Sequence, residues 1–560
     1  MTPGPGPGVG LEAAPRRVHL IGVGGVGMSG LARLLLARGH AVTGSDQKES
    51  AALAALRELG ADVWAGHDAS RLGRPDLVAV STAIRAQNPE LVAAGSLGVP
   101  VVRRARLLAM LMAGRTGLVV AGTHGKTTTT GMATVILQEA GFDPSFAVGG
   151  DFKSTGANAR AGTGGHFVAE ADESDGSFLE LSPTVAVVTN VEADHLDHWG
   201  SLAAIQAGFR QFVALLPPDG TAVLCADDPG ALALAAGAPC AVVTYGLVDQ
   251  PGAGAVVGPA GPAGGRAAAR REPPAGEAGA AVGPAGPAGA LGPGPDMQAT
   301  GVSADGAGSR FTVTAAGREL GEVRLVVPGR HMVANALAAI AATRALGAPF
   351  SAAQAALARY TGAARRFHLR HELGGITVVD DYAHHPTEVA ATLAAARLGQ
   401  WARVVAVFQP HLYSRTRAFA GELGQALSVA DVVLVADVYG AREDPQPGVD
   451  GALVAAAALE ARPSLDCAYV PDRGELAKHT AAVLRPGDLL LTLGAGDITT
   501  LADEVAELLL PGPEPAVGAV PVAEPLPPGP EPAVGAVPVA EPLPPGPGLA
   551  SGAAQVEGPG

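Results

Sequence analysis

A short glycine-rich stretch, GTHGKT, has the composition of a loop that binds phosphate. It follows the apolar run GLVVA and precedes a helical pattern, which places backbone N–H groups at a helix N-terminus. The ammonium group of Lys126 suits the β- and γ-phosphates, and the hydroxyl of Thr127 suits Mg²⁺. The usual eight-residue consensus has glycine where this chain has Val120, so the loop is a shorter variant. The predicted nucleoside triphosphate site consists of Gly122, Thr123, His124, Gly125, Lys126, Thr127 and Thr128.

Two clusters of acidic residues follow apolar runs farther along the chain. EADESD begins at Glu170, directly after HFVA. Acids this dense repel one another unless cations neutralise them, so the stretch predicts either a cation site or a solvated acidic loop. The second cluster, NVEADHLD, contains His195, which on its spacing is either a metal ligand or a structural histidine. Both clusters are expected beyond the carboxyl ends of strands, where ligands bind in open α/β sheets.

A different glycine loop lies near the start of the chain, in VHLIGVGGVGMSG. Gly22, Gly24 and Gly27 have the spacing of a dinucleotide-binding loop, and Asp46 follows where a ribose-binding acid is expected. The loop predicts a backbone that approaches a phosphate closely, but it does not identify the nucleotide. A nicotinamide oxidoreductase is disfavoured, because the lysine loop would then have no task.

Alternating apolar runs and helical patterns must position these loops. Runs such as RVHLIGV and DLVAVSTAI alternate with helical stretches such as SGLARLLLARG, which predicts parallel sheets with crossover helices. The same alternation restarts at GLVVAGTHGK and again in ITVVDD and RVVAVF. We therefore predict three α/β domains, at residues 15–113, 114–361 and 362–510. In the third, the pair His384-His385 indicates a polar site, with too few ligands nearby for a histidine-rich zinc centre.

The composition limits how much of the 560-residue chain can fold. The chain contains 77 glycines and 46 prolines, many of them at residues 1–14, about 249–309 and 511–560. The last of these segments contains PGPEPAVGAVPVAEPLP and then an identical copy, without helical or strand periodicity. Such segments bury too little apolar surface to offset the entropy of the chain, so we predict that all three are disordered.

Charge, cysteine content and hydropathy exclude several classes of protein. The formal net charge of −15 argues against a broad basic surface for nucleic acid. Three cysteines lie far apart without the spacing of metal ligands, which fits a reducing compartment. The sequence shows no signal peptide and no apolar run of membrane-spanning length. We therefore expect a cytoplasmic protein without membrane insertion.

A series of motifs, taken in order, resembles the Mur ligase family. They are GVGGVGMSGLA, GTHGKTTTT, EADESDGSF, TNVEADHLD, GRHMVANALAA, ARRF, DDYAHHPTE, QPHLYSRTR and GAGDIT, between about Val18 and about Glu507. The resemblance implies a Rossmann-like N-terminal domain, a central P-loop ATPase-like domain and a Rossmann-like C-terminal domain. It also implies amide formation with ATP and Mg²⁺ in peptidoglycan precursor synthesis. The motifs are most similar to the branch of the family that joins L-alanine to the lactyl carboxylate of UDP-N-acetylmuramate.

The resemblance further implies roles for individual side chains. The matched catalytic residues are Lys126, His195, His384 and Arg415. The matched metal ligands are Thr127, Glu170 and His195. Beyond the lysine loop, the matched ATP-binding residues are Asn335 and Arg366. The matched UDP-sugar-binding residues are Gly22, Gly24, Gly25, Gly27, Asp46, Ser81, Arg103 and His411.

The chain departs from the family pattern at several places. Leu412 stands where relatives usually have arginine, His368 stands where aspartate is common, and the insert and tails have no counterpart. A recycling ligase, which attaches a preformed tripeptide to the same UDP-sugar, is the nearest alternative. Ser174 favours the alanine branch, because the recycling group tends to carry an aromatic residue there. The sequence leaves open whether the protein is a monomer or a homodimer.

Overall fold

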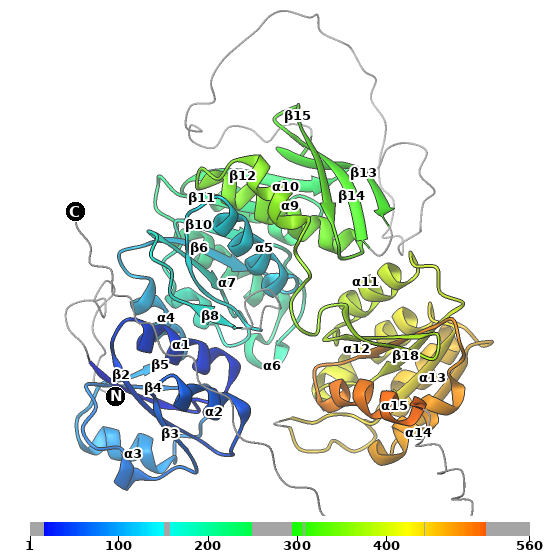
Figure 1. The fold of residues 1–560 in the computed structure, drawn as a ribbon, viewed down its shortest axis with the longest axis horizontal. Helices are drawn as coiled ribbons and strands as arrows, with labels where there is room; N and C mark the ends of the chain where they lie inside the picture. Colours follow the sequence, from blue (N-terminus) through cyan, green and yellow to red (C-terminus); the bar gives the residue numbers. More distant parts are fainter. Residues whose placement is uncertain (1–15, 151–156, 249–293, 306–307, 442, 511–560) are drawn as a thin grey trace, which may run out of the picture. The chain divides into compact units, whose positions relative to one another are not determined.

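The computed structural model describes residues 16–150, 157–248, 294–305, 308–441 and 443–510. Within these ranges the chain forms three β-sheets, each flanked by helices (Figure 1). The three sheets belong to one compact unit. The predicted N-terminal tail, most of the predicted insert and the predicted repeat tail lie outside the described residues. Among the described residues, no helix combines the length and apolar character needed to cross a bilayer.

The first sheet is parallel, with the strand order β3-β2-β1-β4-β5. Its strands are β1 (Arg17–Ile21), β2 (Ala41–Asp46), β3 (Asp62–Ala65), β4 (Leu77–Val80) and β5 (Val101–Arg103). Its helices are α1 (Val26–Ala37), α2 (Ala51–Glu58), α3 (Pro89–Ser96) and α4 (Arg104–Met112). This is the doubly wound order of the predicted Rossmann-like domain. The strand order reverses at β1, so the glycine turn that follows β1 lies where such sheets bind ligands.

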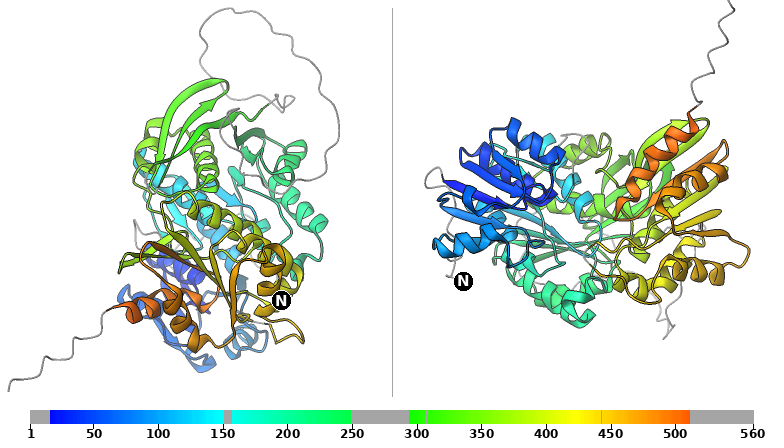
Figure 2. Two further views of the ribbon diagram at one scale, coloured as in Figure 1. Left: turned by 90° about the vertical axis from the view of Figure 1, so that its right-hand side faces the viewer. Right: turned by 90° about the horizontal axis from the view of Figure 1, so that it is seen from below.

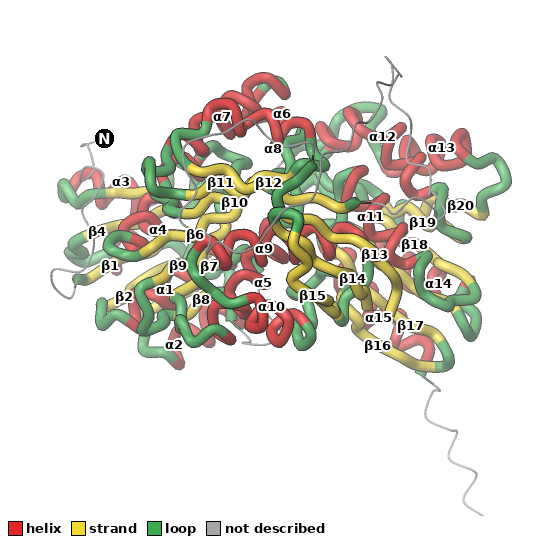
Figure 3. Tube along the Cα trace, turned by 90° about the horizontal axis from the view of Figure 1, so that it is seen from above, coloured by secondary structure: helices red, strands yellow, loops and turns green. Residues whose placement is uncertain are grey.

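The central sheet has the order β15-β14-β13-β12-β11-β10-β6-β9-β7-β8. Its first strands are β6 (Thr116–Ala121), β7 (Ser145–Ala147), β8 (Ala159–Arg160), β9 (His166–Glu170), β10 (Val185–Val188), β11 (Thr221–Cys225) and β12 (Ala241–Leu247). Its helices are α5 (Lys126–Glu139), α6 (Leu196–Trp199), α7 (Leu202–Ala214), α8 (Pro229–Leu232), α9 (Arg330–Ala345) and α10 (Phe350–Leu357). Helices α5, α9 and α10 contact one another (Figure 3). The lysine loop and both acidic clusters follow the carboxyl ends of β6, β9 and β10, which are parallel neighbours, as predicted.

The other three strands of this sheet show that the predicted disordered insert ends earlier than about residue 309. Strands β13 (Met297–Asp305), β14 (Gly308–Ala315) and β15 (Arg318–Leu325) form an antiparallel meander (green in Figure 2). The prediction that the disordered insert extends to about residue 309 is therefore wrong, because β13 lies within it. Tertiary contacts that composition does not reveal hold this strand. It pairs with β12, and Asp296 accepts hydrogen bonds of 2.8 Å from the N–H and the hydroxyl of Thr244.

The C-terminal sheet has the order β16-β17-β21-β18-β19-β20 and is parallel except for β16. Its strands are β16 (His368–Leu373), β17 (Ile376–Asp381), β18 (Arg403–Phe408), β19 (Val432–Ala436), β20 (Asp466–Val470) and β21 (Asp488–Leu493). Its helices are α11 (Pro386–Ala396), α12 (Tyr413–Leu427), α13 (Gly451–Ala461), α14 (Arg473–Val483) and α15 (Leu501–Leu509). Strands β19 and β21 are buried along their whole length, as expected for a sheet covered by helices on both faces.

Candidate active site

The lysine loop connects β6 to α5, and its glycines are required by close contacts. Gly122 has a φ of +133°, and a Cβ atom there would lie 1.9 Å from the hydroxyl of Thr189. Gly125 has a φ of +80° and precedes α5, and a Cβ atom there would lie 2.5 Å from Oδ1 of Asn335. Neither position accepts a larger residue without displacing its neighbour. The loop thus brings bare backbone to the N-terminus of α5, as a phosphate site needs.

Lys126, the first residue of α5, turns back over this loop. Its Nζ donates hydrogen bonds to the carbonyl oxygens of Gly122 (2.7 Å) and Thr123 (2.9 Å) and lies 2.8 Å from the carboxylate of Glu173. Burial would lower the pKa of Lys126, but Glu173 and two neighbouring carboxylates raise it above the ordinary value. Burial raises the pKa of Glu173 to about 7, although Lys126 opposes this shift. Lys126 is therefore a positive charge held in place by oxygen atoms. The oxygen atoms of a bound triphosphate are suited to the same ammonium group.

Next to this lysine lies a set of side chains suited to metal ions. The hydroxyl of Thr127 donates to Oε1 of Glu170 at 3.0 Å, and Oε2 of the same carboxylate accepts the N–H of Gly149 at 2.7 Å. A hydroxyl beside a carboxylate is an oxygen ligand set that Mg²⁺ favours. Nε2 of His195 lies 3.8 Å from Glu173, and burial lowers the pKa of His195, which leaves its ring neutral and able to bind a metal. The residues present therefore fit the predicted ions.

A cavity of about 530 Å³ brings the predicted residues of three domains together. Its lining includes Gly27, Lys126, Thr127, Glu170, His195, Arg366 and His384. Arg104 of α4 also lines it and pairs with Asp172 at 3.0 Å. Cations and carboxylates therefore face the same space, which is the arrangement that a reaction between phosphate and carboxylate groups requires.

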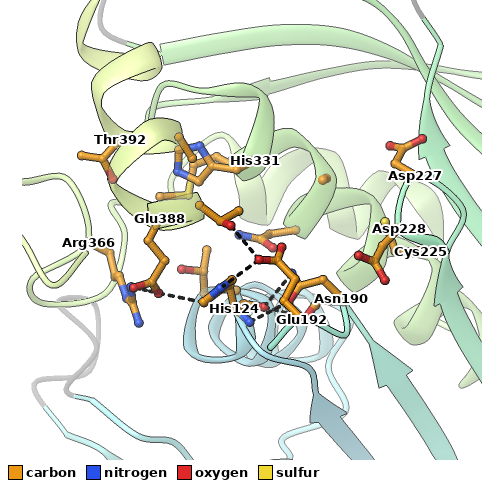
Figure 4. A pocket seen from close by; sticks show the side chains of 18 of the residues that line it. His124, Asn190, Glu192, Cys225, Asp227, Asp228, His331, Arg366, Glu388 and Thr392 are labelled. Atoms are coloured by element: carbon orange, nitrogen blue, oxygen red, sulfur yellow. Dashed lines mark hydrogen bonds and ion pairs between the residues drawn. The ribbon is translucent and has the colours of Figure 1, made fainter. Parts of the chain in front are cut away.

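A second cavity, of about 260 Å³, shares His124, Arg366 and Glu388 with the first. Gly125, Thr128 and Asn335 also line it, as predicted for a nucleotide site. Figure 4 shows Glu388 between Arg366 and His124. Oε1 of Glu388 lies 3.2 Å from Nη1 of Arg366 and 3.4 Å from Nδ1 of His124. Glu388 belongs to the C-terminal domain and His124 to the lysine loop, so this carboxylate connects the two domains at the cavity.

His124 is the centre of a further polar group at this cavity. Its Nε2 lies 3.1 Å from Nδ1 of His385 and 3.7 Å from Oε2 of Glu192. Burial would lower the pKa of His124, but Glu388 and Glu192 raise it to about 9. His124, Glu192 and His385 also lie close enough together to hold a metal ion. The carboxylates of Glu192 and Glu388 pair with the charged ring of His124, and these ion pairs explain why the three side chains lie together without a metal ion.

The C-terminal domain contributes His384, Arg415 and His411 in different ways. His384 lines the larger cavity, and burial lowers its pKa to about 3, so its ring is neutral. Arg415 is buried, and its Nη2 donates to Oδ1 of Asp194 at 2.7 Å. His411 lies beside Arg415, with 3.3 Å between Nδ1 and Nη1, and its ring stacks on Tyr439. Arg415 and His411 do not line the larger cavity; the structure connects them to it through Asp194.

A third cavity, of about 1040 Å³, lies at the glycine turn of the first domain. Its lining includes Gly22, Gly24, Gly25, Asp46, Lys48, His67 and Ser81. A Cβ atom on Gly24 would lie 2.8 Å from Leu53, and its N–H donates to Oδ2 of Asp46 at 2.8 Å. The predicted residue Arg103 is exposed at the end of β5 and lines none of the three cavities. His411, predicted for the same ligand, lies in the C-terminal domain.

Family models match the chain domain by domain. The Mur ligase family catalytic domain matches residues 17–116, the Mur ligase middle domain matches 120–255, and the Mur ligase glutamate ligase domain matches 365–496. The chain belongs to the Mur ligase family. The matched ranges follow the three sheets, so this Mur ligase has the three-domain architecture that the sequence predicts.

Curated relatives extend over most of this Mur ligase. The UDP-N-acetylmuramate–L-alanine ligase of Mycolicibacterium smegmatis is 48% identical, over 89% of this chain and 96% of that protein. The protein of the same name from Kineococcus radiotolerans is 50% identical, over 88% and 96%. Among solved structures, the UDP-N-acetylmuramate-alanine ligase of Thermotoga maritima has a TM-score of 0.68 at 28% identity, covering 88% of this chain and 99% of that one. A murein peptide ligase from Psychrobacter arcticus has a TM-score of 0.61 at 26% identity, covering 88% and 98%.

Several residues at these cavities of the Mur ligase were not assigned from the sequence. They are Lys48, His67, Arg104, Asp172, Glu173, Glu192, Asp194 and Glu388. All five acids lie inside motifs that the sequence singled out, so the motifs were a signal for these residues, although they did not identify the partners of each acid. Two of the departures from the family pattern are single residues, and the first, Leu412, is buried with a φ of +70° before α12. His368 begins β16, and its Nδ1 accepts the N–H of Arg365 at 3.5 Å.

Proposed function

We propose that this Mur ligase joins L-alanine to the lactyl carboxylate of UDP-N-acetylmuramate, with cleavage of ATP to ADP and phosphate. One observation supports this most directly. The N-terminus of α1 faces two cavities: Gly25 lines the one in the first domain, and Gly27 lines the one that contains Lys126. A substrate whose diphosphate rests on Gly25 therefore has its far end directed toward the lysine loop.

The reaction must first activate a carboxylate, whose oxide leaving group is otherwise too poor to depart. A carboxylate oxygen attacks the γ-phosphorus of ATP, which forms an acyl phosphate and releases ADP. The amine of L-alanine then attacks the carbonyl carbon, and the tetrahedral intermediate expels phosphate to leave an amide. Lys126 stabilises the charge that develops on the transferring phosphoryl group.

The remaining assignments follow from the cavities. ATP is assigned to the smallest of the three cavities, of about 260 Å³, and to the lysine loop, with Asn335 and Arg366 beside it. UDP is assigned to the cavity of the first domain. Thr127, Glu170 and His195 would hold Mg²⁺, which when bound neutralises phosphate charge and polarises the transferring group. His384 lines the larger cavity and, as a neutral ring, is suited to accept a hydrogen bond from the amine of L-alanine and so to orient its lone pair toward the carbonyl carbon.

The alternative is a ligase that attaches a preformed tripeptide to the same UDP-sugar. The curated relatives at 48% and 50% identity carry the alanine ligase name, whereas the murein peptide ligase structure is 26% identical. Phosphate release with ATP and UDP-N-acetylmuramate, measured with L-alanine, D-alanine, tripeptide or no acceptor, separates the two. We expect release with L-alanine only. Release with tripeptide and none with L-alanine would support the alternative.

A further inference from the structure

Three side chains with metal-binding atoms meet where the lysine loop faces the C-terminal domain. His124 belongs to the lysine loop, Glu192 follows β10, and His385 is the residue directly before α11. Nε2 of His124 lies 3.1 Å from Nδ1 of His385 and 3.7 Å from Oε2 of Glu192. The same carboxylate oxygen lies 3.9 Å from Nδ1 of His385. The proposed reaction assigns no metal ion to these side chains.

The distances between the three atoms match those between the ligands of one metal ion. Zn²⁺ binds histidine nitrogen and carboxylate oxygen at about 2.0–2.2 Å, in a tetrahedral arrangement. Two ligands of such a tetrahedron lie about 3.3 Å apart. The observed separations lie within about 0.6 Å of this value, and the partly exposed side chain of Glu192 is free to make the adjustment.

A second carboxylate stands where a metal-binding histidine needs one. A histidine ligand usually donates its other ring N–H to a carboxylate, which fixes the ring and raises its basicity. Nδ1 of His124 lies 3.4 Å from Oε1 of Glu388, which Arg366 holds in turn at 3.2 Å. Burial would raise the pKa of Glu388, but neighbouring histidines and Arg366 hold it well below its ordinary value. Glu388 is therefore an ionised acceptor behind the ring of His124.

The other histidine presents a lone pair to the same point. Burial lowers the pKa of His385, so its ring is neutral. Its Nδ1 accepts from Nε2–H of His124, because a charged His124 has no lone pair to offer. Nδ1 of His385 is thus the unprotonated nitrogen, the form that binds a metal. His124 and Glu192 line the cavity of about 260 Å³, from which an ion reaches the cluster and in which its fourth position faces water.

A proton on His124 now stands where the ion would bind. Burial would lower the pKa of His124, but Glu388 and Glu192 raise it to about 9. A metal ion binds only the neutral ring, so it must displace this proton to the solvent. Ions that prefer nitrogen ligands, such as Zn²⁺, are suited to this exchange. Mg²⁺ prefers oxygen ligands and keeps its water, so it is not.

We propose that His124, Glu192 and His385 bind Zn²⁺ or a similar nitrogen-preferring divalent ion through two ring nitrogens and one carboxylate oxygen. The site is separate from the predicted magnesium ligands, because it shares no residue with them. The bound ion joins the lysine loop of the central domain to the N-terminus of α11 in the C-terminal domain. It therefore replaces a hydrogen bond between the two domains with two coordinate bonds.

Titration of the full chain with Co²⁺ in excess Mg²⁺ tests this proposal, because four-coordinate Co²⁺ absorbs strongly in the visible region. The wild-type protein should gain this absorption with one Co²⁺ per chain, and Zn²⁺, which binds such ligands more tightly, should abolish it by displacement. His385→Gln and Glu192→Gln should each weaken binding at least tenfold, because each removes a ligand. The control is His371→Gln, which removes a histidine of β16 that contacts Asp503 at 2.7 Å and should leave Co²⁺ binding unchanged.

The variant His195→Gln separates the proposed site from the predicted magnesium ligands. Absorption that is lost in His195→Gln but kept in His385→Gln and Glu192→Gln would place the ion at the magnesium ligands and overturn the proposal. A wild-type protein without the absorption would overturn it as well. Melting curves establish that each variant is folded, and two variants of the cluster guard against the failure of one. The ligase assignment stands or falls independently, because it does not involve this ion.

Discussion

At the scale of single residues, the account depends most on Lys126, whose charge is placed at the loop that receives the triphosphate. Lys126→Ala should lower turnover on the order of 100-fold or more while leaving the fold intact, because the cation is needed most as charge develops during phosphoryl transfer. Glu173, with a pKa already near 7, is able to remain protonated when its partner is removed. Steady-state phosphate release and circular dichroism measure both effects. Lys478→Ala removes an exposed lysine paired with Glu475 and serves as the control; near-normal turnover of Lys126→Ala would refute the assignment.

Arg415 was matched to a catalytic residue by family resemblance, but its burial indicates that it also stabilises the fold. It is buried against Asp194; burial would raise the pKa of that carboxyl, but Arg415 holds it well below its usual range. Arg415→Gln should lower the free energy of unfolding by about 3–5 kcal/mol, because it leaves a buried charge unpaired. Chemical denaturation measures this, and Arg417→Gln, at an exposed position two residues away, should change it by less than about 0.5 kcal/mol. Equal stabilities for the two variants would show that the buried pair is not a structural element.

At the scale of elements, the position of β13 sharpens the expected effect of removing the insert. Replacing residues 252–292 with a short glycine-serine linker should leave activity and melting temperature nearly unchanged. The closure cost of a loop grows only logarithmically with its length, and β12 and β13 pair through just Tyr245 to Leu247, a short span to bridge. A deletion of 252–308 also removes β13 and should yield insoluble or unfolded protein. Loss of activity in the shorter deletion, with the protein still soluble, would give the insert a functional role.

The sequence predicts the elements that carry local signals and misses those fixed by distant partners. Glycine loops and apolar runs have strong local signatures, so all three α/β domains and the loop at Gly122 were predicted. The strand β13 reads MQATGVSAD inside a glycine-rich context, and its neighbours in the sheet determine its state. The same limit applies to side chains. Nothing near Arg415 in the sequence identifies Asp194 as its partner, and nothing distinguishes Arg103 from Arg104.

At the scale of the whole molecule, His124 links the central and C-terminal domains, and its protonation should be visible in stability. Its pKa is about 9 in the folded chain, against 6.5 when unfolded. A histidine whose pKa is raised by folding contributes its full stabilisation to the folded state below pH 6.5, its pKa when unfolded. This contribution is lost as the pH rises through about 9, its pKa in the folded chain. Between pH 7.5 and 9.5 the free energy of unfolding should therefore fall by about 2 kcal/mol more in the wild type than in His124→Gln. His331, His384 and Glu173 contribute little here, because their folded pKa values are about 4, 3 and 7.

Denaturation curves at both pH values, for the wild type and for His124→Gln, measure this difference. Cysteine titration at the upper end of the range affects both proteins equally and cancels in the comparison. Identical slopes against pH in the two proteins would mean that His124 does not carry a charge at the junction of the domains.

The central claim is that the lactyl carboxylate is activated by phosphoryl transfer and then captured by L-alanine. Transfer of labelled oxygen tests it most directly: UDP-N-acetylmuramate with ¹⁸O in both lactyl carboxylate oxygens is converted with ATP and L-alanine, and the released phosphate is analysed by mass spectrometry. An acyl phosphate intermediate predicts one ¹⁸O atom in each phosphate and one in the amide carbonyl of the product. Phosphate that forms at the same rate without L-alanine, or that carries no label, would contradict the account.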